Sequence, residues 1–163
     1  MKKNLIRSLG IGSILFVGIQ FIIPDENHEG NFENDITKTY AVPENVHTIL
    51  KTSCFNCHSN YTNYPWYTRM QPVRWWITTH ISGGKGKLNF SNFASYNSKM
   101  RYNRFKEIEI NIKGGAMPLP SYLTTHPEGV LSEEQKMTLI NWAKMMQDSM
   151  KMMYPIDSLE EKI

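Results

Sequence analysis

Five consecutive residues, Cys54-Phe55-Asn56-Cys57-His58, constrain this chain most, because they contain its only two cysteines. Cys-x-x-Cys-His is the attachment signal for c-type haem. Two thiols must reach the two vinyl groups of one porphyrin and form thioethers, and the next residue must place an imidazole under the iron. Two intervening residues, wound into a turn, let all three side chains face one side. The motif therefore predicts one covalent haem c on Cys54 and Cys57, with His58 as an iron ligand.

Haem-free interpretations compete for the same residues. A thioredoxin-like thiol pair is expected in a βαβ context, which the neighbouring sequence lacks. A Cys₂His₂ or Cys₄ zinc site needs a second ligand pair at short spacing, whereas His80 and His126 stand alone. A disulfide between residues three apart would be strained. The motif alone leaves these interpretations open, and its context decides for haem.

That context begins at the N-terminus. Lys2, Lys3 and Arg7 precede an uncharged, mostly apolar run of 16 residues from Ser8 to Ile23, just under the length expected of a membrane-spanning helix. The length also suits the apolar region of a signal peptide, but no small-residue cleavage pattern follows. We therefore predict that residues 1–23 form an uncleaved signal anchor in the inner membrane. The positive-inside rule then places the remainder outside the cytoplasm, in the periplasm, where haem c is attached.

The net charge of +3 comes from the three basic residues before the apolar run. The remainder is neutral overall but uneven, since residues 51–113 contain ten basic residues and only two acidic ones, Glu107 and Glu109. Such a region is either a solvated basic face or a surface that pairs with haem propionates or an acidic redox partner. A nucleic-acid partner is not expected outside the cytoplasm.

Composition divides the remainder into three parts. Residues 24–40 are acidic with few apolar side chains, which predicts a flexible linker. Residues 41–153 contain the motif and the periodic apolar segments, and are expected to form the haem-binding domain. Residues 154–163 are predicted to be a loose, charged tail.

Apolar periodicity predicts that this domain is all-α. A first helix is expected at residues 43–53, running directly into Cys54, and a second at residues 72–81, ended by Gly83-Gly84. The polar stretch 85–103 is expected to be irregular.

Two further helices complete the prediction. Phe105, Ile108 and Ile112 mark a third helix, which Gly114-Gly115 would close. Ser132 and Gln135 form the capping-box pattern that opens the last helix. We expect this last helix to pack on the first one.

A methionine follows the third helix in a loop rich in glycine and proline, Ala116-Met117-Pro118-Leu119-Pro120. A thioether is a soft, neutral ligand that suits haem iron and raises its potential, and Pro118 denies the loop a helix. Met117 is therefore the predicted second axial ligand, although it could be one core methionine among ten. His80 is its main rival. Trp66, Tyr67, Trp76 and Pro118 are expected to cover the ring.

The chain resembles small class I c-type cytochromes in its layout. More closely, it is similar to the bacterial haem-binding domain family over roughly residues 41–145. The residues that carry this resemblance follow the cysteine motif and are Ser59-Asn60, Tyr64-Pro65-Trp66-Tyr67, Pro72-Val73-Arg74-Trp75-Trp76, His80-Ile81, Leu88-Asn89-Phe90-Ser91 and Met117-Pro118-Leu119. The resemblance implies a cytochrome c-like helical domain around one haem. The segment rich in tryptophan departs from ordinary class I cytochromes.

Together these features predict a membrane-tethered, extracytoplasmic monohaem c-type cytochrome that transfers electrons to a redox partner protein. One haem with two protein ligands has no open coordination site, so we expect a carrier and not an enzyme. The alternatives are a haem-based sensor or small-gas binding module with a displaceable sixth ligand, and a haem peroxidase with His80 as distal acid and base. A haem-free thiol or zinc module is the remaining alternative.

Overall fold

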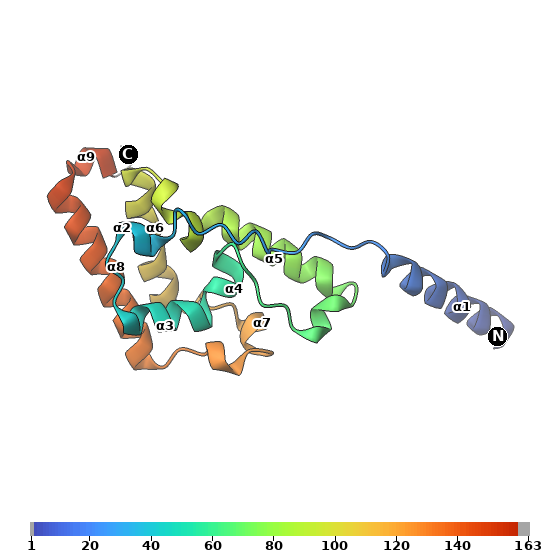
Figure 1. Cartoon of the computed structure of the whole chain (residues 1–163). Helices are drawn as coiled ribbons and strands as arrows, with labels where there is room; N and C mark the ends of the chain where they lie inside the picture. Colours follow the sequence, from blue (N-terminus) through green and yellow to red (C-terminus); the bar gives the residue numbers. More distant parts are fainter. Residues whose placement is uncertain (1, 160–163) are drawn as a thin grey trace.

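The computed structural model describes residues 2–159, and in this range all regular elements are helices or 3₁₀ turns, with no strand (Figure 1). One isolated bridge pairs His28 with Tyr61. The predicted all-α class is therefore confirmed. The helices are α1 (Lys2–Ile19), α2 (Ile36–Thr39), α3 (Glu44–Ser53), α4 (Phe55–His58), α5 (Val73–Lys87), α6 (Ser98–Lys113), α7 (Pro120–Leu123), α8 (Glu133–Met153) and α9 (Ile156–Leu159), with 3₁₀ turns at Trp66–Arg69, Phe90–Ser95 and Pro127–Gly129.

The hydrophobic core lies where α6 and α8 pack along each other, with α3 against α8 (Figure 1). Phe105 and Leu139, from α6 and α8, are fully buried, and Trp142 meets Phe105 edge to face. The predicted capping box opens α8, since the Ser132 hydroxyl accepts from the Gln135 amide. As expected, α8 contacts the first predicted helix, α3, but it packs more extensively on α6, which offers it a longer apolar stripe.

The second predicted helix was too short. Instead of ending at Gly83-Gly84, α5 continues to Lys87, because a glycine inside a helix costs only about 1 kcal/mol and this part of α5 packs against α4. The stretch predicted as irregular also contains structure. It holds the 3₁₀ turn at Phe90–Ser95 and the start of α6, where Asn97 caps the helix by accepting from the Met100 amide.

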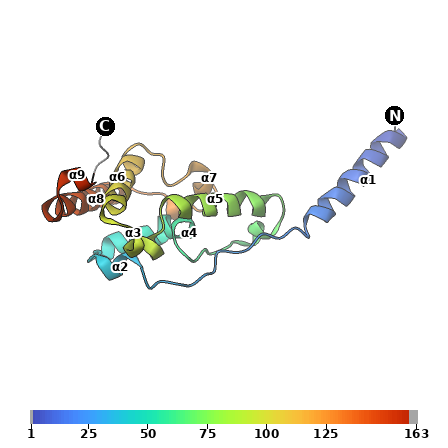
Figure 2. The ribbon, with the colours of Figure 1, turned by 90° about the horizontal axis from the view of Figure 1, so that it is seen from above.

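Helix α1 projects away from the body of the molecule in both views (Figures 1 and 2), and its side chains are exposed along nearly its whole length. No helix within residues 2–159 is both long enough and apolar enough to cross a membrane. The expected membrane helix is therefore not found. The helix includes the basic residues Lys2, Lys3 and Arg7, and it ends at Ile19, before the last apolar residues of the run.

The predicted flexible linker at residues 24–40 is instead packed along the domain. Asn27 is buried, Ile36 is fully buried in the core, and Glu26 and Glu29 form ion pairs with α5. Acidic composition suggested a solvated tether, but these carboxylates face cations that are distant in sequence. The predicted loose tail is also packed as far as Leu159, which is fully buried. Its last residues, 160–163, lie outside the described part of the chain.

Candidate functional site

The cysteine motif forms one tight turn at the end of α3. Cys54 ends that helix, with its amide donating to the Leu50 carbonyl at 2.9 Å. The amides of Cys57 and His58 both donate to the Cys54 carbonyl, at 3.1 and 3.0 Å, which closes the single turn of α4. The three functional side chains are thus carried by one short segment at the end of α3, which buries one face in the core.

The imidazole of His58 is held through one of its two ring nitrogens, Nδ1. Its Nδ1 lies 2.9 Å from the Leu88 carbonyl and 3.1 Å from the Gly84 carbonyl. Because carbonyls only accept, the proton must sit on Nδ1, which leaves Nε2 with its lone pair available for a metal. Burial lowers the pKa of His58, partly opposed by these two hydrogen bonds. Burial therefore favours the neutral ring, which is the form that binds iron.

Gly84 allows α5 to approach this turn closely. A Cβ at Gly84 would lie 3.0 Å from the Cys57 carbonyl oxygen and 3.4 Å from Cε1 of the His58 ring. A Cβ at the neighbouring Gly83 would meet nothing within 4 Å. The sequence indicated only that this glycine pair would stop a helix. The structure shows that Gly84 brings the α5 backbone within hydrogen-bonding distance of His58.

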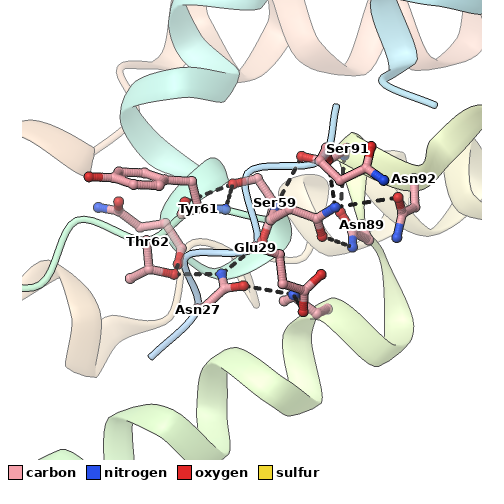
Figure 3. A network of polar contacts seen from close by, with 12 residues as sticks. Asn27, Glu29, Ser59, Tyr61, Thr62, Asn89, Ser91 and Asn92 are labelled. Carbon is pink, nitrogen blue, oxygen red and sulfur yellow. Dashed lines mark hydrogen bonds and ion pairs between the residues drawn. The ribbon is translucent and has the colours of Figure 1, made fainter. Parts of the chain in front are cut away.

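A buried polar network holds the segment after the motif (Figure 3). Asn60 is almost fully buried, and its side chain bridges three segments of the chain. It donates to the Asn31 carbonyl at 2.7 Å and accepts from the Asn89 amide group at 2.8 Å. The Asn60 backbone amide donates to the Ser91 hydroxyl at 3.0 Å. The network thereby fixes the loop at Asn89 next to Leu88, whose carbonyl orients His58.

Asn27 anchors the same segment from the N-terminal side (Figure 3). Its amide group donates to the Ser59 carbonyl at 2.9 Å and to the Thr62 hydroxyl at 2.8 Å. Lys85 on α5 donates to the Asn27 side-chain oxygen at 2.6 Å and pairs with Glu29 at 2.9 Å. Residues 27–31 therefore strap the turn that carries the motif onto α5.

Two adjoining cavities open beside the motif, with volumes of about 330 and 400 Å³. Six residues line both of them, namely Ser53, Cys54, His58, Lys87, Met117 and Pro118. Leu50, Phe90, Ile112 and Leu139 give the larger cavity an apolar wall. His58 and Met117 therefore share the walls of both cavities, although 59 positions separate them in the sequence.

The loop that carries Met117 begins where α6 ends. Gly115 has a φ of +69°, the left-handed conformation with which glycine commonly ends a helix. The amides of Ala116 and Met117 both donate to the Asn111 carbonyl, at 2.9 and 3.3 Å. Met117 is half-buried and packs against the edge of the core.

The other predicted site residues differ in how they relate to the two cavities. His80 is exposed, lines the smaller cavity, and its Nδ1 lies 2.8 Å from the Trp76 carbonyl. Trp76 is half-exposed and its ring lies 4.5 Å from that of His80. Trp66 is 75% exposed, and neither it nor Tyr67 lines a cavity with His58. Pro118 is thus the one predicted ring-covering residue on both cavity walls.

Both thiols are held in their neutral form. Burial, with a smaller contribution from Cys57, raises the pKa of Cys54 to about 12, and burial raises the pKa of Cys57 as well. A thiol–disulfide enzyme needs a thiolate with a lowered pKa, so this environment does not favour a reactive redox pair. Within residues 2–159 no three His, Cys, Asp or Glu side chains are grouped to hold a metal ion, which gives a zinc site no support.

Sequence reasoning missed several residues that shape the site. Gly84 and Leu88 orient the His58 ring, Asn60 fixes their neighbourhood, and Tyr122 lines the smaller cavity while accepting from the Asn56 amide group at 2.9 Å. The motifs Ser59-Asn60 and Leu88-Asn89-Phe90-Ser91 contained part of this information. The available signal was the asparagine in each of these motifs, because an asparagine that becomes buried must find hydrogen-bond partners.

These residues fit a haem. Two thiols, one imidazole with a free Nε2 and one thioether gather at cavities whose volumes lie in the usual range for small-molecule sites. Phe90, Ile112 and Leu139 offer the apolar surface that a porphyrin face requires.

Comparison with known proteins supports this chemistry. No curated protein and no solved structure matches the chain. The model of one protein family, described as the haem-binding domain, matches residues 14–145. This match covers most of the sequence and includes the motif, the strap at residues 27–31 and the Met117 loop. The chain therefore belongs to the haem-binding domain family.

Proposed function

We propose that this protein is a monohaem c-type cytochrome that transfers electrons to a redox partner protein. One observation carries the proposal: the His58 imidazole is fixed through Nδ1 by two backbone carbonyls, and it lines cavities whose walls it shares with Met117. This is the arrangement that a metal-bound histidine needs, with one ring nitrogen oriented by the protein and the other left free.

Each residue of the site has a defined role in this proposal. Cys54 and Cys57 would hold the haem through thioethers, each thiol adding its sulfur to one carbon of a vinyl group and its hydrogen to the other. His58 and Met117 would bind the iron, and Pro118 shapes the loop that carries Met117. A bound haem supplies one-electron exchange between ferric and ferrous iron. Two protein ligands leave no site for a substrate, which suits a carrier in a cytochrome c-like fold.

We further propose that the domain works outside the cytoplasm. Lys2, Lys3 and Arg7 before an uncharged apolar run have the pattern of an export segment. Covalent haem attachment takes place in that compartment, so the address and the motif agree. Fractionation of cells that express the full chain tests this point, and a haem-loaded product confined to the cytoplasm would contradict it.

Mass spectrometry tests haem attachment directly. The full chain, co-expressed with a haem-attachment system, should gain the mass of one haem on the peptide containing Cys54 and Cys57. Replacing both cysteines by alanine should abolish the gain, whereas Ser53→Ala, on the same cavity wall, should retain it. An unmodified chain that binds one zinc ion would contradict the proposal.

The second candidate is a haem-based sensor, which the weak anchoring of the Met117 loop favours. A visible spectrum of the loaded chain, oxidised and reduced, separates the two functions. A carrier should show a six-coordinate spectrum that carbon monoxide leaves unchanged. Binding of carbon monoxide to the reduced wild type would favour a sensor, or a peroxidase in which His80 is the distal acid and base.

A further inference from the structure

The walls of the two cavities carry very little charge. Their linings contain a single lysine or arginine, Lys87, and it lines both cavities. The other charged side chain is Glu107 in the larger cavity, and Arg104 lies 2.6 Å from its carboxylate. Lys87 therefore supplies the one uncompensated positive charge on these walls.

No other lysine or arginine of the basic region lines either cavity, and several of them have partners elsewhere. Arg74 pairs with Glu26 and Lys85 with Glu29, at 3.1 and 2.9 Å. Arg101 donates to the Tyr96 and Ala94 carbonyls. No ion pair or hydrogen bond holds the Lys87 ammonium within the described residues. Of the basic residues between positions 51 and 113, Lys87 is thus the one that offers a free ammonium group to the two cavities.

Lys87 lies next to the residues that orient His58. It is the last residue of α5, directly before Leu88, whose carbonyl accepts from His58. A lysine at this position also interacts favourably with the free carbonyls at the C-terminal end of α5. That interaction does not require the side chain to line the two cavities, as Lys87 does. Lys87 is the one lysine or arginine on these walls, so a porphyrin carboxylate that lies near it would meet no competing cation. A pair of an ammonium and a carboxylate is a charge-assisted hydrogen bond.

We propose that Lys87 binds a propionate carboxylate of the porphyrin and thereby sets its orientation in the site. This inference rests on the proposed haem function and names the residue that recognises the acidic edge of the ring. The contact is a charge-assisted hydrogen bond at a solvent-exposed position, so its contribution is modest.

Paired porphyrins test this contact without relying on covalent attachment or activity. The full chain, prepared without attached haem, is titrated with iron mesoporphyrin and with its dimethyl ester in the same dilute-detergent buffer. Mesoporphyrin has ethyl groups in place of vinyl groups, so it forms no thioether. Lys87→Gln should weaken binding of the free acid roughly threefold to tenfold and leave binding of the ester unchanged.

Three variants control the result. Lys106→Gln removes an exposed lysine on α6 that lines neither cavity, and it should bind both porphyrins as the wild type does. Lys87→Arg should retain the preference for the free acid, and Lys87→Glu should reverse it. Equal weakening of acid and ester by Lys87→Gln, or no change in either, would overturn the inference.

The reduction potential of the haem-loaded chain gives a second, independent measurement. Without the Lys87 charge, the negative charge of the propionate is no longer offset, which favours the ferric state. Lys87→Gln should therefore lower the potential, while Lys106→Gln should not. Equal potentials in both variants would overturn the inference and leave the haem proposal intact. A wild type that binds neither porphyrin and carries no haem would instead contradict the haem proposal itself.

Discussion

The two sides of the candidate site are held very differently. His58 ends α4, the turn that follows α3, and its ring is oriented by the carbonyls of Gly84 and Leu88. The buried side chains of Asn60 and Asn89 are hydrogen-bonded to each other next to Leu88. Met117 lies in a loop whose preceding residues, 114–116, are exposed. The Met117 amide shares the Asn111 carbonyl with the Ala116 amide, at the longer distance of 3.3 Å. The His58 side is therefore held by several contacts from other segments of the chain, whereas the Met117 side lies in a loop at the edge of the core.

Because the two sides are held differently, haem binding and the chemistry of the bound haem can be examined separately. Whether the chain holds a haem depends on the His58 side, which the fold presents in a fixed geometry. Whether the haem carries electrons or binds a small ligand depends on the Met117 side, which is the less restrained one. Changes on the His58 side should therefore cost stability, and changes on the Met117 side should cost little stability but alter the iron.

Asn60→Ala should give the largest effect. The substitution leaves the buried Asn89 amide group and the Asn31 carbonyl without partners, so the free energy of unfolding should fall by about 3 kcal/mol. Denaturant unfolding measures the change. Asn63→Ala is the control, because Asn63 is exposed and its side chain makes no hydrogen bond in the described structure; it should change stability by less than about 0.5 kcal/mol. Similar values for both variants would mean that the network does not hold this side.

The adjacent glycines of α5 should respond in opposite directions. Gly84→Ala places a Cβ against the Cys57 carbonyl, and should destabilise the chain by about 1–2 kcal/mol and reduce haem loading. Gly83→Ala meets open space within a helix and should stabilise the chain by about 0.5–1 kcal/mol. Thermal unfolding and the yield of loaded protein measure both effects. Stabilisation by Gly84→Ala would show that close approach of α5 is not required.

Met117→Ala should cost only about 1 kcal/mol of stability, since the side chain is half-buried at the edge of the core. Its spectral effect should be much larger: loss of the near-infrared sulfur-to-iron band, a lower potential and binding of carbon monoxide to the reduced iron. Met117→His should keep two ligands and also lower the potential. His80→Ala should leave the spectrum unchanged. If His80→Ala changes the spectrum and Met117→Ala does not, the iron is bound by two histidines.

Trp66→Ala should have the smallest effect. Trp66 is 75% exposed and lines neither cavity, so neither the visible spectrum nor haem loading should change. Pro118→Ala, on both cavity walls, is the matched comparison and should broaden or shift the spectrum. A spectral change with Trp66→Ala alone would restore the original prediction that this tryptophan covers the ring.

Local signals in the sequence predicted the local structure well. The Ser132 and Gln135 capping box, the helix before Cys54 and the glycine end of α6 depend on neighbours within a few residues, and the structure contains all three. The resemblance to the haem-binding family is likewise confirmed by the match over residues 14–145. These features need no knowledge of what lies across the molecule.

The failures concern partners that are distant in sequence. Glu26 and Glu29 suggested a solvated linker because their partners, Arg74 and Lys85, lie about fifty residues away. Gly84 suggested a helix end because its actual neighbour, Cys57, belongs to another helix. The acceptor that orients His58 is a backbone carbonyl, which any residue type provides, so no sequence pattern could single out Leu88.

The strap at residues 27–31 bears on where the smallest independently folding unit begins. The sequence suggested a domain starting at residue 41, but a fragment cut there would lack the side chain of Asn27 and the carbonyl of Asn31, which buried groups near the motif use as partners. Such a fragment would keep every residue of the haem motif while losing part of the scaffold that aims its histidine. A shortened version for spectroscopy or crystallisation should therefore begin no later than Pro24, so that the strap is retained.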